Sequence, residues 1–150
     1  MRICIGGTFN RLHKGHKKLI NTAIQRAGED GFVFIGLSSG ELVYGKPFVE
    51  RFENRRNILL DYLKTQNHLP SILIEAITTV EGPTLDMDFD EIIVSEETKN
   101  VAIKINNKRI KRGLKEMNIV VIPLVLAEDD QKISSSRILN DEIDEQGKIP

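Results

Sequence analysis

The first sixteen residues constrain this chain most, because an apolar segment there ends in two glycines and a threonine. The segment at residues 3–5 is short enough for a buried strand, and Gly6-Gly7-Thr8 follows it directly. The pattern His13-x-Gly15-His16 comes next and opens a helical periodicity. A strand, a glycine-rich turn and a helix start place backbone N–H groups around an anion. The stretch therefore predicts a phosphate-binding site.

The rest of the chain alternates between strand and helix patterns. Short apolar runs predict strands at residues 2–6, 32–36, 71–77, 91–95 and 118–126. Amphipathic spacing predicts helices at residues 16–27, 51–66, 98–114 and 134–145. Strands that alternate with helices over such short spacings are typical of a parallel sheet. We therefore predict one domain over residues 1–150, with an α/β, Rossmann-like fold: a five-stranded parallel sheet with helices on both faces.

Charge and composition limit the classes of partner. A formal net charge of -1 argues against a general nucleic-acid surface, which needs a basic excess to neutralise phosphates. Polar residues interrupt the N-terminal apolar run by Asn10, and no stretch approaches the length of a membrane span. We expect a cytoplasmic protein that binds neither nucleic acid nor membranes, and a small anionic ligand is compatible with its charge.

In a sheet of this kind, ligands bind beyond the carboxyl ends of the strands. Five predicted loops meet there: residues 6–10, 38–46, 79–84, 95–98 and 129–136. His13 and His16 lie three residues apart at a helix start, so both can face one anion. A protonated or hydrogen-bond-donating imidazole there can stabilise charge that grows on a phosphorus oxygen. Two histidines without a third ligand make a poor zinc site, so we expect no protein-bound metal.

Two further loops carry candidate phosphate ligands. Lys46 lies in a polar loop and can hold a phosphate as a point charge, although a loop lysine is more often solvated. Three serines at residues 134–136 offer hydroxyl and N–H donors at a helix start, and Arg137 adds charge. A simple helix cap is the other interpretation of the serines.

Basic residues elsewhere have a plainer interpretation. Arg51, Arg55 and Arg56 fall on the second predicted helix, where we expect a solvated face with local ion pairs. We expect the same for most of the lysines and arginines between residues 99 and 115.

Residues 6–16, Gly-Gly-Thr-Phe-Asn-x-x-His-x-Gly-His, resemble the signature of the nucleotidylyltransferase superfamily. Asn10 stands where that signature usually has aspartate. Further motifs are similar to the archaeal and eukaryotic type of the phosphopantetheine adenylyltransferase family over nearly the whole chain. They are residues 36–42, Lys46-Pro47, Gly82-Pro83-Thr84, residues 93–98, Asn106-x-x-Arg109 and residues 132–136. The superfamily's arginine often falls two residues beyond Arg137, where this chain has Leu139.

The resemblance implies an enzyme of coenzyme A biosynthesis. It would transfer the adenylyl group of ATP to 4'-phosphopantetheine, giving dephospho-CoA and pyrophosphate, with Mg²⁺ bound to the ATP phosphates as cofactor. By resemblance, the catalytic residues are His16, Lys46 and Thr8, and Thr8, Lys46, Gly82, Pro83 and Thr84 bind the acceptor. By resemblance, ATP is bound by Gly7, Thr8, Phe9, His13, His16, Ser95, Glu96, Thr98, Asn106, Arg109, Ser134, Ser135, Ser136 and Arg137.

The sequence also leaves other functions open. Another nucleotidylyltransferase, such as an FAD synthetase or a glycerol-phosphate cytidylyltransferase, would share the first motif, although residues 95–98 and the Lys46 loop argue against it. A class I aminoacyl-tRNA synthetase shares the histidine signature, but we expect no tRNA-binding domains in 150 residues. A flavodoxin-like module that binds a nucleotide without catalysis would not need two histidines. A scaffolding role would leave both motifs unexplained.

Overall fold

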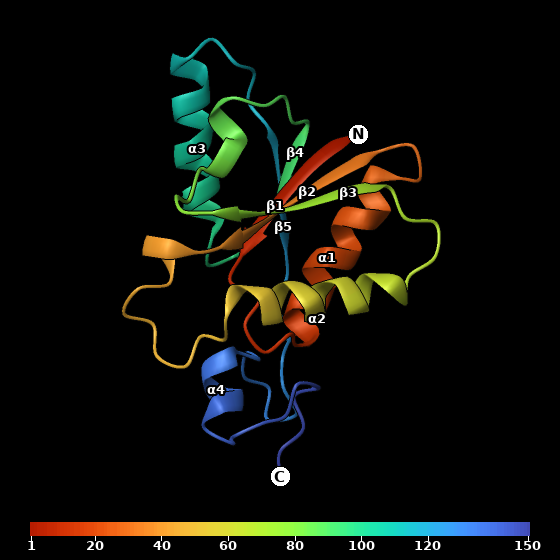
Figure 1. The fold of residues 1–150 in the computed structure, drawn as a ribbon, viewed down its shortest axis with the longest axis vertical. Helices are drawn as coiled ribbons and strands as arrows, with labels where there is room; N and C mark the ends of the chain where they lie inside the picture. Colours follow the sequence, from red (N-terminus) through yellow and green to blue (C-terminus); the bar gives the residue numbers. More distant parts are fainter.

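The computed structural model describes residues 1–150 and contains five parallel strands with helices on both faces of the sheet (Figure 1). The strands are β1 (Arg2–Gly7), β2 (Phe32–Ser38), β3 (Ser71–Ile77), β4 (Glu91–Ser95) and β5 (Asn118–Ile122). The helices are α1 (Lys14–Ala27), α2 (Phe52–Lys64), α3 (Lys99–Lys111) and α4 (Ser135–Leu139), with 3-10 turns η1 (Gly40–Leu42) and η2 (Gly82–Leu85). The predicted fold class is confirmed.

The strand order places a reversal point beside β1. The order is β3-β2-β1-β4-β5, so the chain fills one side of β1 first and then returns to the other side. β1 and β4 pair through Ile3 with Glu91 and Cys4 with Ile92, near the start of each strand. The loops that follow these two strands therefore leave in opposite directions, and ligands of open α/β sheets bind at such a reversal point.

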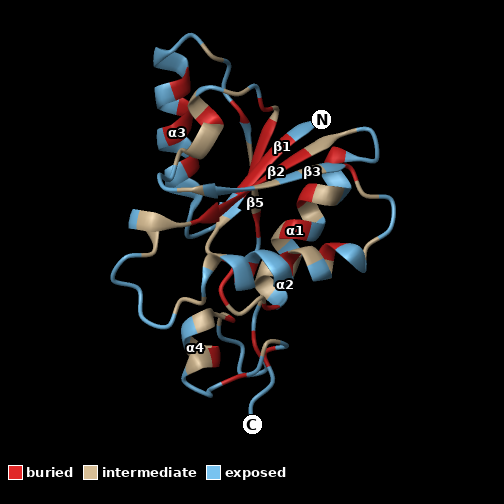
Figure 2. Ribbon diagram, in the orientation of Figure 1, coloured by how far each residue is buried: buried red, intermediate tan, exposed pale blue.

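Alternate residues of β1 face different helices. Ile3 and Ile5 pack in one buried cluster with Ile20 of α1 and Leu59 of α2. Cys4 points to the other face and belongs to a second cluster that includes Ala102 of α3. Figure 2 shows the buried residues concentrated in the central strands, with exposed residues along the outer sides of the helices. Burial of apolar surface on both faces of the sheet stabilises this layered arrangement.

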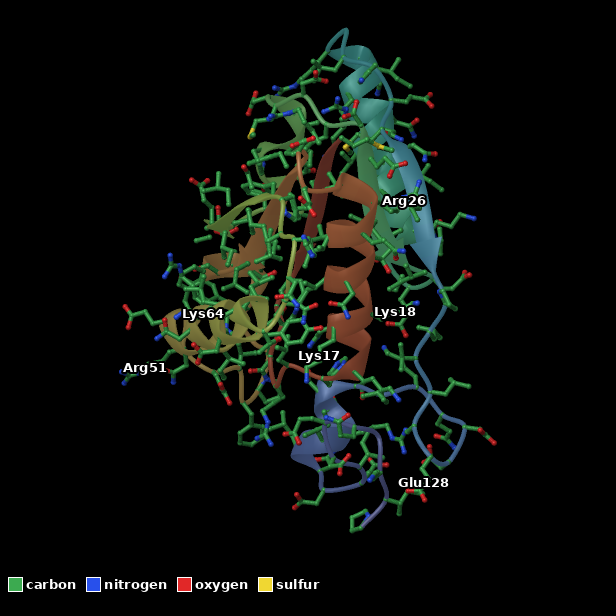
Figure 3. All side chains as sticks on the ribbon, turned by 90° about the vertical axis from the view of Figure 1, so that its right-hand side faces the viewer. Lys17, Lys18, Arg26, Arg51, Lys64 and Glu128 are labelled. Carbon is green, nitrogen blue, oxygen red and sulfur yellow. The ribbon has the colours of Figure 1, made fainter.

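An ion pair also joins α1 to the sheet. Arg26, which is labelled in Figure 3, lies in the last turn of α1. It donates from Nε and Nη2 to the Glu91 carboxylate at 2.7 and 2.8 Å. Asn118 of β5 donates to the same carboxylate at 2.8 Å. These bonds hold the pKa of Glu91 below its usual range, chiefly through the bond from Arg26, so this buried carboxylate stays charged.

The C-terminal segment forms a small cluster beyond the carboxyl ends of the strands, next to α4 (Figure 1). Its buried residues are Ala127, Ile133, Ile138 and Ile143. The Lys14 N–H donates to the Glu145 carbonyl at 3.1 Å, which ties this segment to the first residue of α1. None of the helices combines the length and apolar character of a membrane span.

Two predicted boundaries are wrong by four residues or more. The last strand ends at Ile122 rather than at residue 126, because Pro123 follows and has no N–H for the ladder. The last helix ends at Leu139 rather than at residue 145. Asp141 adopts a φ of 58°, and the Glu142 N–H donates to the Arg137 carbonyl at 2.9 Å, which closes a Schellman motif and stops the helix.

Candidate active site

A cleft of about 540 Å³ lies at the carboxyl ends of the strands. All five loops that the sequence predicts at this edge contribute to it. The predicted site residues that line it are Gly7, Thr8, Phe9, His13, His16, Lys46, Ser95, Thr98, Ser134 and Ser135. A cavity of this size is in the range that binds a nucleotide-sized ligand. The structure therefore gathers residues from both ends of the chain around one cleft.

The other predicted site residues lie outside this cleft. They are Gly82, Pro83, Thr84, Glu96, Asn106, Arg109, Ser136 and Arg137. Ser136 lines a neighbouring pocket of about 510 Å³, which shares Thr8 and Lys46 with the cleft.

Each of the two histidines accepts backbone hydrogen bonds at the start of α1 through its own Nδ1. His13 is the N-cap of α1, and its Nδ1 accepts the N–H groups of Gly15 at 3.0 Å and of His16 at 3.3 Å. The Nδ1 of His16 accepts the His13 N–H at 3.3 Å. An imidazole that accepts at Nδ1 carries its proton on Nε2 when it is neutral. Each histidine that lines the cleft therefore has a free Nε2–H donor.

Both rings are neutral near pH 7. Burial, reinforced by the charge of Lys132, lowers the pKa of His13 to about 4. Burial, reinforced by the neighbouring His13, lowers the pKa of His16 to about 3. The rings stack with centroids 3.7 Å apart and planes at 17°, a geometry that disfavours two positive charges. The sequence left open whether these imidazoles are charged, and the structure favours neutral hydrogen-bond donors.

The depressed histidine pKa values predict a pH dependence of stability. The unfolded chain binds protons below about pH 6.5 that the folded His13 and His16 do not bind, so the free energy of unfolding should fall as the pH drops from 6.5 toward 4. The variant His13→Asn keeps an N-cap acceptor and removes one titrating group. Its loss of unfolding free energy over this range should be smaller by about 1–3 kcal/mol, measured by urea denaturation. Equal losses in variant and parent would contradict the neutral state of His13.

Lys46 and Thr8 meet at the edge of the cleft that opens into the neighbouring pocket. The Lys46 Nζ donates to the Thr8 Oγ1 at 3.5 Å, although the two residues are 38 positions apart. The lysine is exposed, so its charge is available to a ligand. A hydroxyl and an ammonium group side by side are able to bind a phosphate.

Asn10 fastens the loop that carries Lys46. Its Nδ2 donates to the Phe48 carbonyl at 3.1 Å, and its Oδ1 accepts the Glu50 N–H at 3.0 Å. The Ser135 hydroxyl donates to the Asn10 carbonyl. A carboxylate can only accept hydrogen bonds, so the bond to Phe48 requires the amide that replaces the usual aspartate. Asn10 thus links the glycine-rich loop, the Lys46 loop and the start of α4.

The prediction of a solvated face is wrong for Arg55. This side chain is 3% exposed and donates from Nη1 to the carbonyls of Thr8 at 3.0 Å and Ser38 at 2.9 Å. Its Nε donates to the Glu50 carbonyl at 2.8 Å. By contrast, Arg51 is exposed and points away from the body of the molecule (Figure 3). The sequence held a signal for this, because Arg55 lies four residues before Leu59 on the buried side of the helix.

Replacing Arg55 should therefore destabilise the protein. Arg55→Ala leaves three carbonyl groups without their donor and should lower the free energy of unfolding by about 2–4 kcal/mol. Urea denaturation measures this change. Arg56→Ala, at the next and exposed position, is the matched control and should stay within about 0.5 kcal/mol of the parent. A loss for Arg55→Ala no larger than that of the control would show that these bonds add nothing.

Asn106 and Arg109 lie on the buried side of α3 rather than at the cleft. Asn106 exchanges two hydrogen bonds of 2.8 Å with the backbone of Met117. Arg109 is fully buried, and its guanidinium donates to the carbonyls of Thr84, Met87 and Lys115. Arg109, which the resemblance implies as an ATP ligand, lies outside the lining of the cleft and is engaged by backbone carbonyl groups. The geometry gives both residues a structural task, which is to hold η2 and the start of β5 against α3.

Arg137 is also occupied within the protein. Its guanidinium donates to the Lys132 carbonyl at 2.8 Å and to the Asp129 carboxylate, and its Nε lies 3.8 Å from the Glu142 carboxylate. Ser134 caps α4, since its Oγ accepts the Arg137 N–H at 3.2 Å. Arg137 therefore stabilises the loop before α4, and the cleft is lined by Lys132, Ser134 and Ser135 from this motif.

Comparison with known proteins agrees with this geometry. Residues 4–141 match the model of the Cytidylyltransferase-like family. The chain is 44% identical to the phosphopantetheine adenylyltransferase of Methanosarcina acetivorans, over 99% of this chain and 95% of that protein. It is 41% identical to the phosphopantetheine adenylyltransferase of Archaeoglobus fulgidus, over 99% of both chains.

Solved structures show the same fold. A protein of unknown function from Archaeoglobus fulgidus superposes with a TM-score of 0.72 at 38% identity, covering 81% of this chain and 89% of that one. Tyrosyl-tRNA synthetase from Archaeoglobus fulgidus superposes with a TM-score of 0.59 at 14% identity, covering 91% of this chain and 59% of that one, which is a likeness of fold alone. The two relatives above match the chain from end to end, at an identity that goes well beyond shared fold. This chain therefore belongs to the phosphopantetheine adenylyltransferase family of cytidylyltransferase-like proteins.

Proposed function

We propose that this protein transfers the adenylyl group of ATP to 4'-phosphopantetheine, releasing pyrophosphate and forming dephospho-CoA. Relatives that match nearly the whole chain carry the name of this activity. The observation that carries the proposal is the meeting of two phosphate-binding arrangements in one cleft. The paired histidines form one, and Lys46 beside Thr8 forms the other.

The reaction needs positioning more than proton transfer. An oxygen of the acceptor phosphate bonds to the α-phosphorus of ATP, and the bond from that phosphorus to the bridging oxygen breaks. Pyrophosphate leaves with the electron pair. The attacking phosphate is already ionised at neutral pH, so no general base is required. The protein has to bring two anions together and stabilise the charge on the phosphorus oxygens.

We assign the two arrangements to the two substrates. Thr8 and Lys46 hold the acceptor phosphate, with the hydroxyl as a hydrogen-bond donor and the ammonium group as a point charge. His13 and His16 donate from Nε2 to phosphate oxygens of ATP, and His16 stabilises the charge that develops during transfer. Ser134 and Ser135, which also line the cleft, bind the ATP phosphates.

We propose that Mg²⁺ enters as part of the substrate, bound to the phosphates of ATP. The donor set of the cleft fits phosphate oxygens, since it consists mainly of N–H, hydroxyl and ammonium groups. Glu97 is the one carboxylate among the lining residues, and it is paired with Lys132. Mg²⁺ bound in this way would neutralise part of the triphosphate charge.

An acceptor assay tests the proposal. The purified protein is incubated with MgATP and 4'-phosphopantetheine, and pyrophosphate and dephospho-CoA are quantified. We expect both products in equal amounts. FMN with ATP, and glycerol phosphate with CTP, serve as competing acceptors. Turnover with either of these but not with 4'-phosphopantetheine would overturn the assignment.

A further inference from the structure

The cleft has few sources of full positive charge. ATP carries a polyanionic triphosphate, yet His13 and His16 are neutral donors and Arg137 is engaged outside the cleft. Among the residues that line the cleft, only Lys46 and Lys132 carry a permanent positive charge. Lys46 contacts Thr8, which the proposed function assigns to the acceptor phosphate. Lys132 is therefore the cation left for ATP.

Lys132 is held at the cleft by a residue from another loop. Its Nζ donates to both carboxylate oxygens of Glu97, at 2.7 and 2.6 Å, over a separation of 35 residues. Lys132 comes from the loop before α4 and Glu97 from the loop after β4, and both residues line the cleft. The charge of Lys132 also contributes to the lowered pKa of His13, which lines the same cleft.

This ion pair can exchange partners. The two side chains are 40% and 55% exposed, and such exposed pairs contribute little to stability. A triphosphate group carries more negative charge than one carboxylate. Bound ATP therefore competes effectively with Glu97 for the ammonium group of Lys132. A lysine side chain has the freedom to turn from one oxygen ligand to another.

We propose that Lys132 binds the phosphates of ATP, and that Glu97 holds Lys132 in the absence of nucleotide and releases it when ATP binds. The proposal rests on the proposed function, in which this cleft takes ATP. Under this proposal, Lys132 and Glu97 have opposite effects on the affinity for ATP. Lys132 attracts the triphosphate, whereas Glu97 competes with it for the same cation and also repels it.

Binding of a non-hydrolysable ATP analogue with Mg²⁺, measured by titration calorimetry, tests this. Lys132→Met should weaken binding about 10- to 100-fold, because it removes a charged hydrogen-bond donor. Lys132→Arg should retain most of the affinity. Glu97→Gln should tighten binding about 2- to 10-fold, because it frees Lys132 and removes a negative charge. Lys99→Met, an exposed position in the first turn of α3 outside the lining of the cleft, is the control and should bind as the parent does.

The direction of the Glu97→Gln effect decides between two roles. If the pair merely braces the two loops, both variants lose the brace and both weaken binding. Weaker binding by Glu97→Gln, or an unchanged affinity of Lys132→Met, would therefore overturn the proposal. Thermal melts check that each variant is folded, and if Lys132→Met does not fold, the direction of the Glu97→Gln effect decides alone.

The same experiment separates this proposal from the proposed function. The calorimetric assay contains no acceptor. Opposite effects of the two variants in a protein that makes no dephospho-CoA would support the role of Lys132 and overturn the proposed acceptor. Normal dephospho-CoA formation together with equal effects of the two variants would overturn the role of Lys132 alone. A parent protein that does not bind the analogue would overturn both.

Discussion

Replacing His16 by alanine should lower turnover about 100- to 1,000-fold while the affinity for ATP changes less than about tenfold. The Nε2–H of His16 is positioned by the hydrogen bond that its Nδ1 accepts from the His13 N–H, so the donor is already oriented before the substrates bind. A donor of this kind contributes most when charge grows on the phosphorus oxygens during transfer. The measurement is a comparison of kcat for dephospho-CoA formation with the dissociation constant of a non-hydrolysable ATP analogue.

The control for this experiment is His68→Ala. His68 is an exposed histidine between α2 and β3, outside the lining of the cleft, and its replacement should leave kcat unchanged. If His16→Ala weakens binding of the analogue by as large a factor as it lowers kcat, His16 acts in binding alone. An unchanged kcat would remove His16 from the reaction.

Replacing Lys46 by methionine should raise the KM for 4'-phosphopantetheine about 10- to 100-fold and leave the KM for ATP within about threefold. Lys46 is exposed beside the Thr8 hydroxyl, and its methylene chain is largely retained in methionine, so the variant removes mainly the charge. Steady-state kinetics with each substrate varied in turn separates the two constants.

Lys64→Met is the matched control, since Lys64 is an exposed lysine at the end of α2 (Figure 3). It should leave both constants unchanged. Equal increases of the two KM values for Lys46→Met would show that Lys46 does not distinguish the acceptor from ATP.

The parts of the fold that could be predicted are those set by local patterns. The strand at residues 2–6 and the glycine-rich turn after it are readable because apolar spacing and glycine act over a few neighbours. Once the sheet is known to be parallel, the place of five loops at one edge follows from topology. The structure accordingly gathers His13, Lys46 and Ser134 at one cleft, although they are far apart in the chain.

The direction of long charged side chains could not be predicted in the same way. Arg55 looks like a member of a solvated helix face, and Arg109 looks by resemblance like an ATP ligand, yet each is buried on backbone carbonyl groups from other segments. Arg137 resembles a phosphate ligand, but Asp129 and Glu142 engage it. The direction of each arginine side chain depends on hydrogen-bonding groups that come near only in the tertiary structure. The sequence gives only the residue type and its position on the helix.

The role of Asn10, which differs from the usual residue of the signature, becomes clear only in the structure. In the sequence it is one amide in place of the usual aspartate. In the structure this amide both donates and accepts, and it anchors the Lys46 loop at Phe48 and Glu50. The exchange of a carboxylate for an amide therefore ties the Lys46 loop to the glycine-rich loop.

In the proposed reaction, an oxygen of the acceptor phosphate attacks the α-phosphorus of ATP in this cleft. The direct test uses 4'-phosphopantetheine labelled with ¹⁸O in its phosphate, incubated with MgATP and the protein, followed by mass spectrometry of both products. The predicted result is dephospho-CoA that retains all of the label, including the oxygen between the two phosphorus atoms, and unlabelled pyrophosphate. Label in the pyrophosphate, or the absence of labelled dephospho-CoA, would contradict it.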